Sequence, residues 1–348
     1  MKKRLTVIIL VVAILATSIF ALAGCQKTDY VIGIMENSEH YSSDMVLKGF
    51  KEKLSSLMSE EGKSIKYVYR KSSGDDDEKI AQSEKSNVET LLKKNASAIF
   101  TMSLSSANAV AEYAPNTASV FAQPAIADRT LQKEDLRIQV EKQVEIMRLL
   151  APDAKLGILY CNPANADKKT KADINMEMQV ELAREIIGAE NLVEIGYDKK
   201  EDMTHDGHIR QELNKMKEEG VGCVFMPVDN TLASFSIGPK IHERANTNIY
   251  TSNNGLPQRE VSGMPIVCGD INMNEYCGVA TYAVDYYAMG EQAAIEVFEM
   301  LTGNGENKYA EIKTDFSKGK CVVNEKVAEE IGFTISQEVK EKIENLIA

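Results

Sequence analysis

Short apolar runs alternate with stretches of helical periodicity along most of the chain. The first run, Tyr30 to Met35, reads as a strand. A helix is expected next, with its N-cap within residues 42–44 and with one apolar face made of Val46, Phe50, Leu54 and Leu57. A later helix is predicted by the spacing of Val140, Val144 and Met147.

The same pattern predicts the remaining elements. Strands are expected at 65–69, 98–102, 119–122, 156–160, 192–195, 221–226 and 248–251. Helices are expected at 78–94, from Ser105 or Ser106, at 172–187, 207–218, 231–245 and 290–301, the last ending at Gly303. Strands separated by helices indicate parallel sheets, and two successive sets predict an α/β fold of two doubly wound domains.

Polar residues follow most of the predicted strands. In open α/β sheets ligands bind beyond the carboxyl ends of the strands, so these residues are candidates for a binding site. If the two domains face each other along those ends, the candidates line one shared cleft. They are Glu39 and His40, Ser105 and Ser106, Asn162, Asp229 and Asn230, and Asn253.

The N-terminus has the layout of a secretory signal. Lys2, Lys3 and Arg4 precede an uncharged, apolar stretch that ends at Gly24. Leu22-Ala23-Gly24-Cys25 resembles the lipobox of bacterial lipoproteins, in which the cysteine receives a diacylglycerol after cleavage just before it. Residues 1–24 are therefore expected to be a signal peptide, with Cys25 lipidated and 25–29 as a linker. An uncleaved membrane anchor is the alternative.

Length and charge narrow the classes of function. A chain of 348 residues is long enough for two domains, and its net charge of −12 disfavours binding to the phosphate backbone of nucleic acids. Beyond Cys25, five cysteines remain without a CxxC spacing, which argues against zinc and redox motifs; a bridge between Cys268 and Cys277 stays open. No metal or cofactor is expected, and no common catalytic motif is present.

Several short segments, in this order and spacing, resemble the substrate-binding lipoproteins of ABC importers, in particular those associated with tryptophan and tyrosine uptake. The resemblance covers nearly all of the chain after residue 25. Its carriers are Ile32-Gly33-Ile34 with Glu39-His40 and Asp44, Val120-Phe121-Ala122, Val140-Glu141-Lys142-Gln143, Gly157-Ile158-Leu159-Tyr160 with Asn162-Pro163, Pro227-Val228-Asp229-Asn230-Thr231, Asp285-Tyr286-Tyr287 with Gly290, and Val322-Val323-Asn324.

The resemblance implies the type I periplasmic-binding-protein fold, with two α/β lobes joined by three crossovers. The chain would cross near 138, 283 and 318, so that lobe 1 holds 30–138 and 284–317 and lobe 2 holds 139–283 and 318–348. It also implies a monomer on the outer face of the membrane that delivers a small solute to an ABC permease and its ATPase. The sequence departs from the family at 136–139, at 165–168 and by a longer segment between Gly255 and Gly278.

An amino-acid solute needs donors for its carboxylate and an acceptor for its ammonium group. Ser105-Ser106-Ala107 at a helix start suits the carboxylate, as the resemblance also implies, although a plain N-cap is the alternative. Asp285 suits the ammonium group, with helix capping as its alternative. Four tyrosines are candidates for an aromatic surface that a ligand contacts, with ordinary packing as the alternative: Tyr41, Tyr160, Tyr282 and Tyr286.

Three alternatives to an amino-acid importer component stay open. One is a lipoprotein that senses a ligand for a signalling partner. Another is a binder of nucleosides or other small solutes on the same fold. The third is an extracytoplasmic enzyme, which the missing catalytic motifs disfavour.

Overall fold

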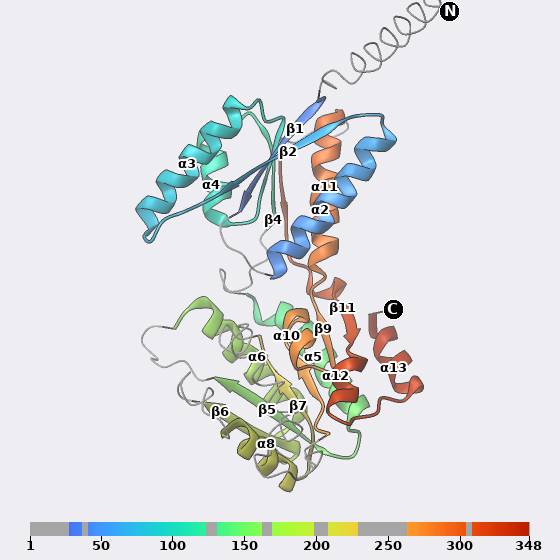
Figure 1. The fold of residues 1–348 in the computed structure, drawn as a ribbon. Coiled ribbons are helices and arrows are strands. Elements are labelled where there is room, and N and C mark those ends of the chain that lie inside the picture. Colours follow the sequence, from blue (N-terminus) through green and yellow to red (C-terminus); the bar gives the residue numbers. More distant parts are fainter. Residues whose placement is uncertain are drawn as a thin grey trace, which may run out of the picture. The chain divides into compact units, whose positions relative to one another are not determined.

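The protein is an α/β chain with two sheets, each at the centre of one compact unit (Figure 1). This computed structural model describes residues 28–36, 41–122, 131–161, 169–197, 208–228, 263–303 and 308–347. The first unit holds the described residues of 1–38, 51–121 and 293–311, and the second holds those of 39–50, 122–292 and 312–348. Among the described residues, no helix is long and apolar enough to cross a bilayer.

The sheet of the first unit has five strands in the order β10-β4-β3-β1-β2. β1 pairs in parallel with both β2 and β3, and β3 pairs in parallel with β4. The strands are β1 (Tyr30–Glu36), β2 (Ile65–Lys71), β3 (Ala98–Thr101), β4 (Ala118–Ala122) and β10 (Tyr309–Ile312). Every side chain of β3 is buried, as expected for a central strand of a parallel sheet covered on both faces.

Two helices of the first unit, α3 (Asp77–Lys93) and α4 (Leu104–Tyr113), pack against each other beside this sheet (Figure 1). Val88 and Leu91 of α3 and Val110 of α4 meet Met35 and Ile99 of the strands in one buried cluster. The apolar faces of the amphipathic helices and the apolar side chains of the strands are thus buried against each other, as the alternating sequence pattern predicts.

The sheet of the second unit has six strands in the order β11-β9-β8-β7-β5-β6. All described pairs in it are parallel except β11 with β9, which is antiparallel. The strands are β5 (Lys155–Cys161), β6 (Leu192–Tyr197), β7 (Val221–Met226), β8 (Ile266–Cys268), β9 (Ala280–Ala283) and β11 (Lys320–Val323). The two parallel-dominated sheets confirm the predicted α/β fold class.

The longer helices of the second unit, which follow the predicted periodicity, are α5 (Lys133–Leu150), α6 (Lys171–Ile187) and α8 (His208–Glu218). The unit also holds the short helices α10 (Ile271–Tyr276), α12 (Glu325–Glu330) and α13 (Gln337–Glu344), and 3₁₀ turns at Ala189–Asn191, Phe316–Lys318 and Asn345–Ile347. The predicted face of α5, made of Val140, Val144 and Met147, is buried. The helix predicted at 231–245 and the strand at 248–251 lie outside the described residues.

Helices α2 (Tyr41–Glu60) and α11 (Tyr286–Thr302) cross at two glycines. A Cβ on Gly290 would overlap the carbonyl oxygen of Val46, and a Cβ on Gly49 would overlap that of Tyr287. The two backbones therefore touch without intervening side chains, at positions that both belong to the second unit. Because the contact is close, it fixes how the N-terminal halves of the two helices lie relative to each other.

Two details of these helices differ from the sequence prediction. α2 begins at Tyr41, so residues 42–44 lie inside its first turn and do not cap it. Its buried face continues from Leu54 to Met58, whereas Leu57 is only half-buried, because steps of four residues keep one face toward the core. As predicted, α11 ends at Gly303, which adopts a positive φ of 82°.

Candidate functional site

Two aspartates follow neighbouring parallel strands at the carboxyl edge of the second sheet. Asp270, just after β8, accepts a hydrogen bond from the Met273 N–H and caps α10. Asp285, just after β9, accepts hydrogen bonds at Oδ1 from the N–H groups of Tyr287 and Ala288, at 3.1 and 3.2 Å, and caps α11. Since β8 and β9 pair in parallel, both carboxylates lie at the edge where α/β sheets bind ligands.

Asp285 also forms an ion pair. Lys320 of β11 lies beside the end of β9, and its Nζ is 3.0 Å from Oδ1 of Asp285. Oδ1 thus serves three donors, whereas Oδ2 accepts no hydrogen bond from the described residues. The capping role that the sequence left open is therefore present, and one oxygen remains for a further cation.

Tyr41, in the first turn of α2, lies among three carboxylates. Its hydroxyl donates to Oε1 of Glu275 in α10 at 3.2 Å. The pKa of Tyr41 is raised, first by burial of the phenol and then by the negative charge of Glu275, with smaller contributions from Asp270 and Asp285. Counted over the described residues, three acids and one ion-paired lysine, Lys320, give this edge of the second unit a net negative charge.

Two buried glutamines of α5 hold the backbone at the same edge. Gln139 donates from Nε2 to the carbonyl oxygen of Gly269 at 2.9 Å. Gln143 donates from Nε2 to the Tyr282 carbonyl oxygen at 2.9 Å and lies 3.3 Å from those of Cys268 and Gly269. They fix the segments that lead into the two caps, a role that the sequence analysis missed because a glutamine on a helix shows no partner in sequence.

Two asparagines of α10 were also missed by the sequence analysis. Asn272 and Asn274 are almost fully buried, and their side-chain oxygens accept no hydrogen bond within the described part of the chain. A buried amide oxygen without a donor is costly, so such atoms often mark a place where a ligand or water binds. No pattern in the sequence pointed to them, because α10 lies in the segment between Gly255 and Gly278 that is longer than in the family.

The first turn of α4 differs from the sequence prediction. The helix begins at Leu104, and Ser103 is its N-cap, accepting from the Ser106 N–H at 3.2 Å. The hydroxyls of Ser106 and Ser105 donate to Oε1 of Glu84 in α3, at 2.8 and 3.2 Å. The Ala107 N–H is bonded within the helix to the Ser103 carbonyl. Both serine hydroxyls are therefore already hydrogen-bonded to a buried carboxylate of the protein, that of Glu84.

The other tyrosines have partners in the fold. Tyr282 is buried and donates to the Phe316 carbonyl oxygen at 2.7 Å, and Tyr286 is buried at the start of α11. Tyr160 donates to Glu194 at 2.6 Å, and burial together with this carboxylate raises its pKa to about 12. It lines a cavity of about 380 Å³ together with Arg184 and other side chains of α6.

Seven predicted positions lie outside the described residues. They are Cys25, Glu39, His40, Asn162, Asp229, Asn230 and Asn253. Of the predicted site, the structure thus describes Ser105, Ser106 and Ala107 in the first unit and Asp285 in the second. Within the described ranges, no group of three or more His, Cys, Asp or Glu side chains is arranged to hold a metal ion.

Solved structures with this fold include substrate-binding proteins. The ligand-free, open structure of CD0873, a substrate binding protein with adhesive properties from Clostridium difficile, is 18% identical, with a TM-score of 0.56 over 88% of this chain and 96% of that one. An ABC domain from Streptococcus pneumonia in complex with L-Trp is 19% identical, with a TM-score of 0.51 over 89% and 98%. The fold is therefore that of the type I periplasmic binding proteins.

The family follows from the sequence itself. Residues 134–346 match the model of the ABC transporter substrate binding protein family, and the chain belongs to this family. No curated protein sequence matches the chain. Proteins of this family bind a small molecule for an ABC transporter outside the cytoplasm, and the family is one of solute-binding proteins and not of enzymes.

Proposed function

We propose that the protein is a lipid-anchored receptor that binds an amino acid, with aromatic amino acids as the first candidates, and delivers it to an ABC permease and its ATPase. The observation that carries the choice of an amino acid is the group of carboxylates around Tyr41. Its net negative charge suits an ammonium group, and the phenol ring supplies a surface for a cation or an aromatic side chain.

Asp285 is proposed as the direct partner of the ammonium group. Its Oδ2 accepts no hydrogen bond from the described residues, while Oδ1 is held by two backbone N–H groups and Lys320. A carboxylate oriented in this way needs little reorganisation to accept a charge-assisted hydrogen bond. The L-Trp complex of the related fold supports an amino acid as the solute, and an aromatic one as the first to test.

The rest of the predicted site belongs to the same proposal. Glu39, His40, Asn162, Asp229, Asn230 and Asn253 are carried forward as contacts to the solute. Ser105, Ser106 and Ala107 are carried forward as contacts to its carboxylate. This role requires the two serine hydroxyls to release their hydrogen bonds to Glu84 and to donate to the ligand instead. The predicted crossover points and lobe boundaries also remain proposals, as does a monomeric state.

The lipid anchor is proposed from the lipobox at Leu22-Ala23-Gly24-Cys25. In a bacterial host that lipidates such signals, the full chain should partition into the detergent phase of a Triton X-114 extract, whereas the Cys25→Ser variant should not be processed into a lipidated form. A wild-type chain that keeps residues 1–24 and carries no lipid would indicate an uncleaved membrane anchor instead.

The amino-acid assignment is tested by ligand-dependent melting of the purified protein with each of the common amino acids and a set of nucleosides. A solute at 100 times its Kd should add about 2.7 kcal/mol of stability. The chain contains no Trp, so the fluorescence of added L-Trp reports binding without a protein background. If only nucleosides or no compound raises the melting temperature, the amino-acid assignment is wrong.

The role of Asp285 is tested with Asp285→Asn, because Asn is as good an N-cap as Asp but carries no charge. Loss of one charge-assisted contact should weaken amino-acid binding by about 10- to 100-fold. Asp76→Asn is the matched control, since Asp76 caps α3 in the other unit. An Asp285→Asn variant that binds as tightly as the wild type removes Asp285 from the site.

A further inference from the structure

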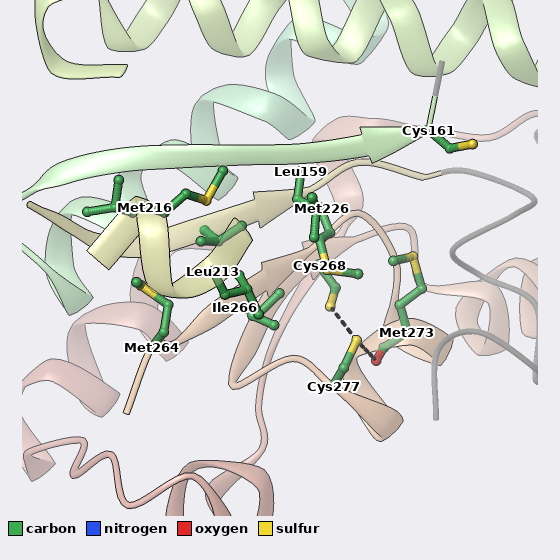
Figure 2. Packing of buried hydrophobic residues seen from close by; sticks show 12 residues of the cluster. Leu159, Cys161, Leu213, Met216, Met226, Met264, Ile266, Cys268, Met273 and Cys277 are labelled. Carbon is green, nitrogen blue, oxygen red and sulfur yellow. Dashed lines mark hydrogen bonds between the residues drawn. The ribbon is translucent and has the colours of Figure 1, made fainter. Parts of the chain in front are cut away.

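Two cysteines of the second unit face each other in its core. Cys268 is the last residue of β8, and Cys277 is the C-cap of α10, so the short helix returns the chain to the strand from which it departed. Figure 2 shows both thiols in a cluster of apolar side chains that includes Met226 and Met273. The exposed fraction is 0% for Cys268 and 2% for Cys277.

The two sulfur atoms are 3.7 Å apart, in hydrogen-bonding contact (Figure 2). Cys277 Sγ also lies 3.4 Å from the carbonyl oxygen of Met273. The residue after Cys277 is Gly278, where a Cβ would come within 2.7 Å of Cys268 Sγ. Only glycine leaves the space that this thiol pair occupies.

We propose that Cys268 and Cys277 form a disulfide bond in the exported protein. The sulfur atoms, now 3.7 Å apart, need to approach by about 1.7 Å to reach the bond length of a disulfide. Proteins of this family work outside the cytoplasm, where disulfides form and persist. The bond would join the end of β8 to the end of α10, the helix that carries Glu275 and is capped by Asp270.

The other thiols are poorer partners. Met226 is paired with Cys268 in the sheet register, so both point to the same face, whereas Cys223 lies three residues before Met226 and points to the other face. Cys161 ends β5, which is separated from β8 by β7. Cys321 belongs to β11, where it is opposite Tyr282 of β9. The five described thiols thus give one bridge and three free cysteines.

The oxidation requires an external disulfide, either of a thiol–disulfide oxidoreductase or of a small molecule. The thiolate of one cysteine attacks a sulfur of that disulfide and expels a thiol. The second cysteine then attacks the mixed disulfide and expels the other thiol. Two protons and two electrons pass to the external disulfide, which becomes two thiols. Since both cysteines are buried, the reaction takes place before the second unit has finished folding.

The test uses the full chain, exported by a bacterial host and extracted from its membranes in detergent with N-ethylmaleimide present. After denaturation, one half is alkylated directly and the other half is alkylated after reduction. The reduced half should carry two more adducts. The non-reduced protein, digested with a protease, should yield the Cys268 and Cys277 peptides linked, about 2 Da lighter than the two reduced peptides together.

Cys223→Ala is the matched control, because it removes an equally buried thiol from the same sheet and should leave the difference of two adducts unchanged. Cys268→Ala or Cys277→Ala should abolish the difference. Wild-type protein refolded with a reductant should melt about 5–10 °C below protein refolded in a glutathione redox buffer. The proposal is wrong if both alkylated halves match, or if the linked peptides contain a different cysteine.

Discussion

The crossing of α2 and α11 provides a sharp test of the packing. Gly290→Ala places a methyl group against the backbone of α2, where the carbonyl oxygen of Val46 and, at 2.7 Å, the nitrogen of Phe50 already stand. Neither atom belongs to a side chain, so no rotamer change relieves the overlap. The two helices have to separate, or α2 has to deform.

The expected loss of stability is the difference between two opposing terms. Alanine is better than glycine in a helix by about 1 kcal/mol. Overpacking a well-packed contact costs about 1–3 kcal/mol, and the rigid backbone places this site at the upper end. The net loss is about 2 kcal/mol, which corresponds to a melting temperature about 4–8 °C lower for a unit of this size.

The measurement is a thermal melt followed by circular dichroism, with Lys48→Ala as the control. Lys48 is exposed on α2, next to Gly49, so this variant also introduces alanine in a helix but meets no backbone. Gly49→Ala, which meets the Tyr287 carbonyl, should behave like Gly290→Ala. Gly290→Ala melting at or above the wild-type temperature would refute the close backbone contact.

Three further predictions concern single hydrogen-bonding groups. Gln143→Met keeps the volume but leaves the buried Tyr282 carbonyl without this donor, so denaturant unfolding should show a loss of about 1–3 kcal/mol; an unchanged midpoint contradicts it. Ser103→Ala removes the cap of α4 and should cost about 1 kcal/mol in the same assay, whereas no loss means that the cap is unimportant. The pKa of Glu194 in the folded protein is lowered mainly by hydrogen bonds from Arg184. The stability that this carboxylate contributes is therefore fully present above its unfolded pKa of about 4.3, and it is lost as the pH falls through the lower folded pKa. The melting temperatures of wild type and Glu194→Gln should therefore converge between pH 5 and pH 3, and a constant difference would contradict this.

Much of the fold was predictable because each strand is a compact apolar run and each long helix shows one apolar face. The strand at 221–226 and the end of α11 at Gly303 agree with the structure. The short elements β8, α10 and β9 were not recognised. A strand of three residues and a helix of six carry too little periodicity to distinguish them from a loop.

The candidate site was predictable only in part, for a physical reason. Asp285 was found because it lies near a crossover that the family resemblance implies and just before a predicted helix. Its partner Lys320, the pairing of Tyr41 with Glu275, and the use of Ser105 and Ser106 by Glu84 all join residues that are far apart in the chain. Such contacts depend on which strands become neighbours, and spacing along the sequence does not contain that information.

The edge strands β10 and β11 come late in the chain, yet each completes a sheet that earlier strands began. The first sheet is incomplete until β10 has been synthesised, up to residue 312, and the second sheet is incomplete until β11 has been synthesised, up to residue 323. A chain truncated before residue 309 would therefore leave both sheets without an edge strand, so neither unit can complete its fold until nearly all of the polypeptide has been synthesised.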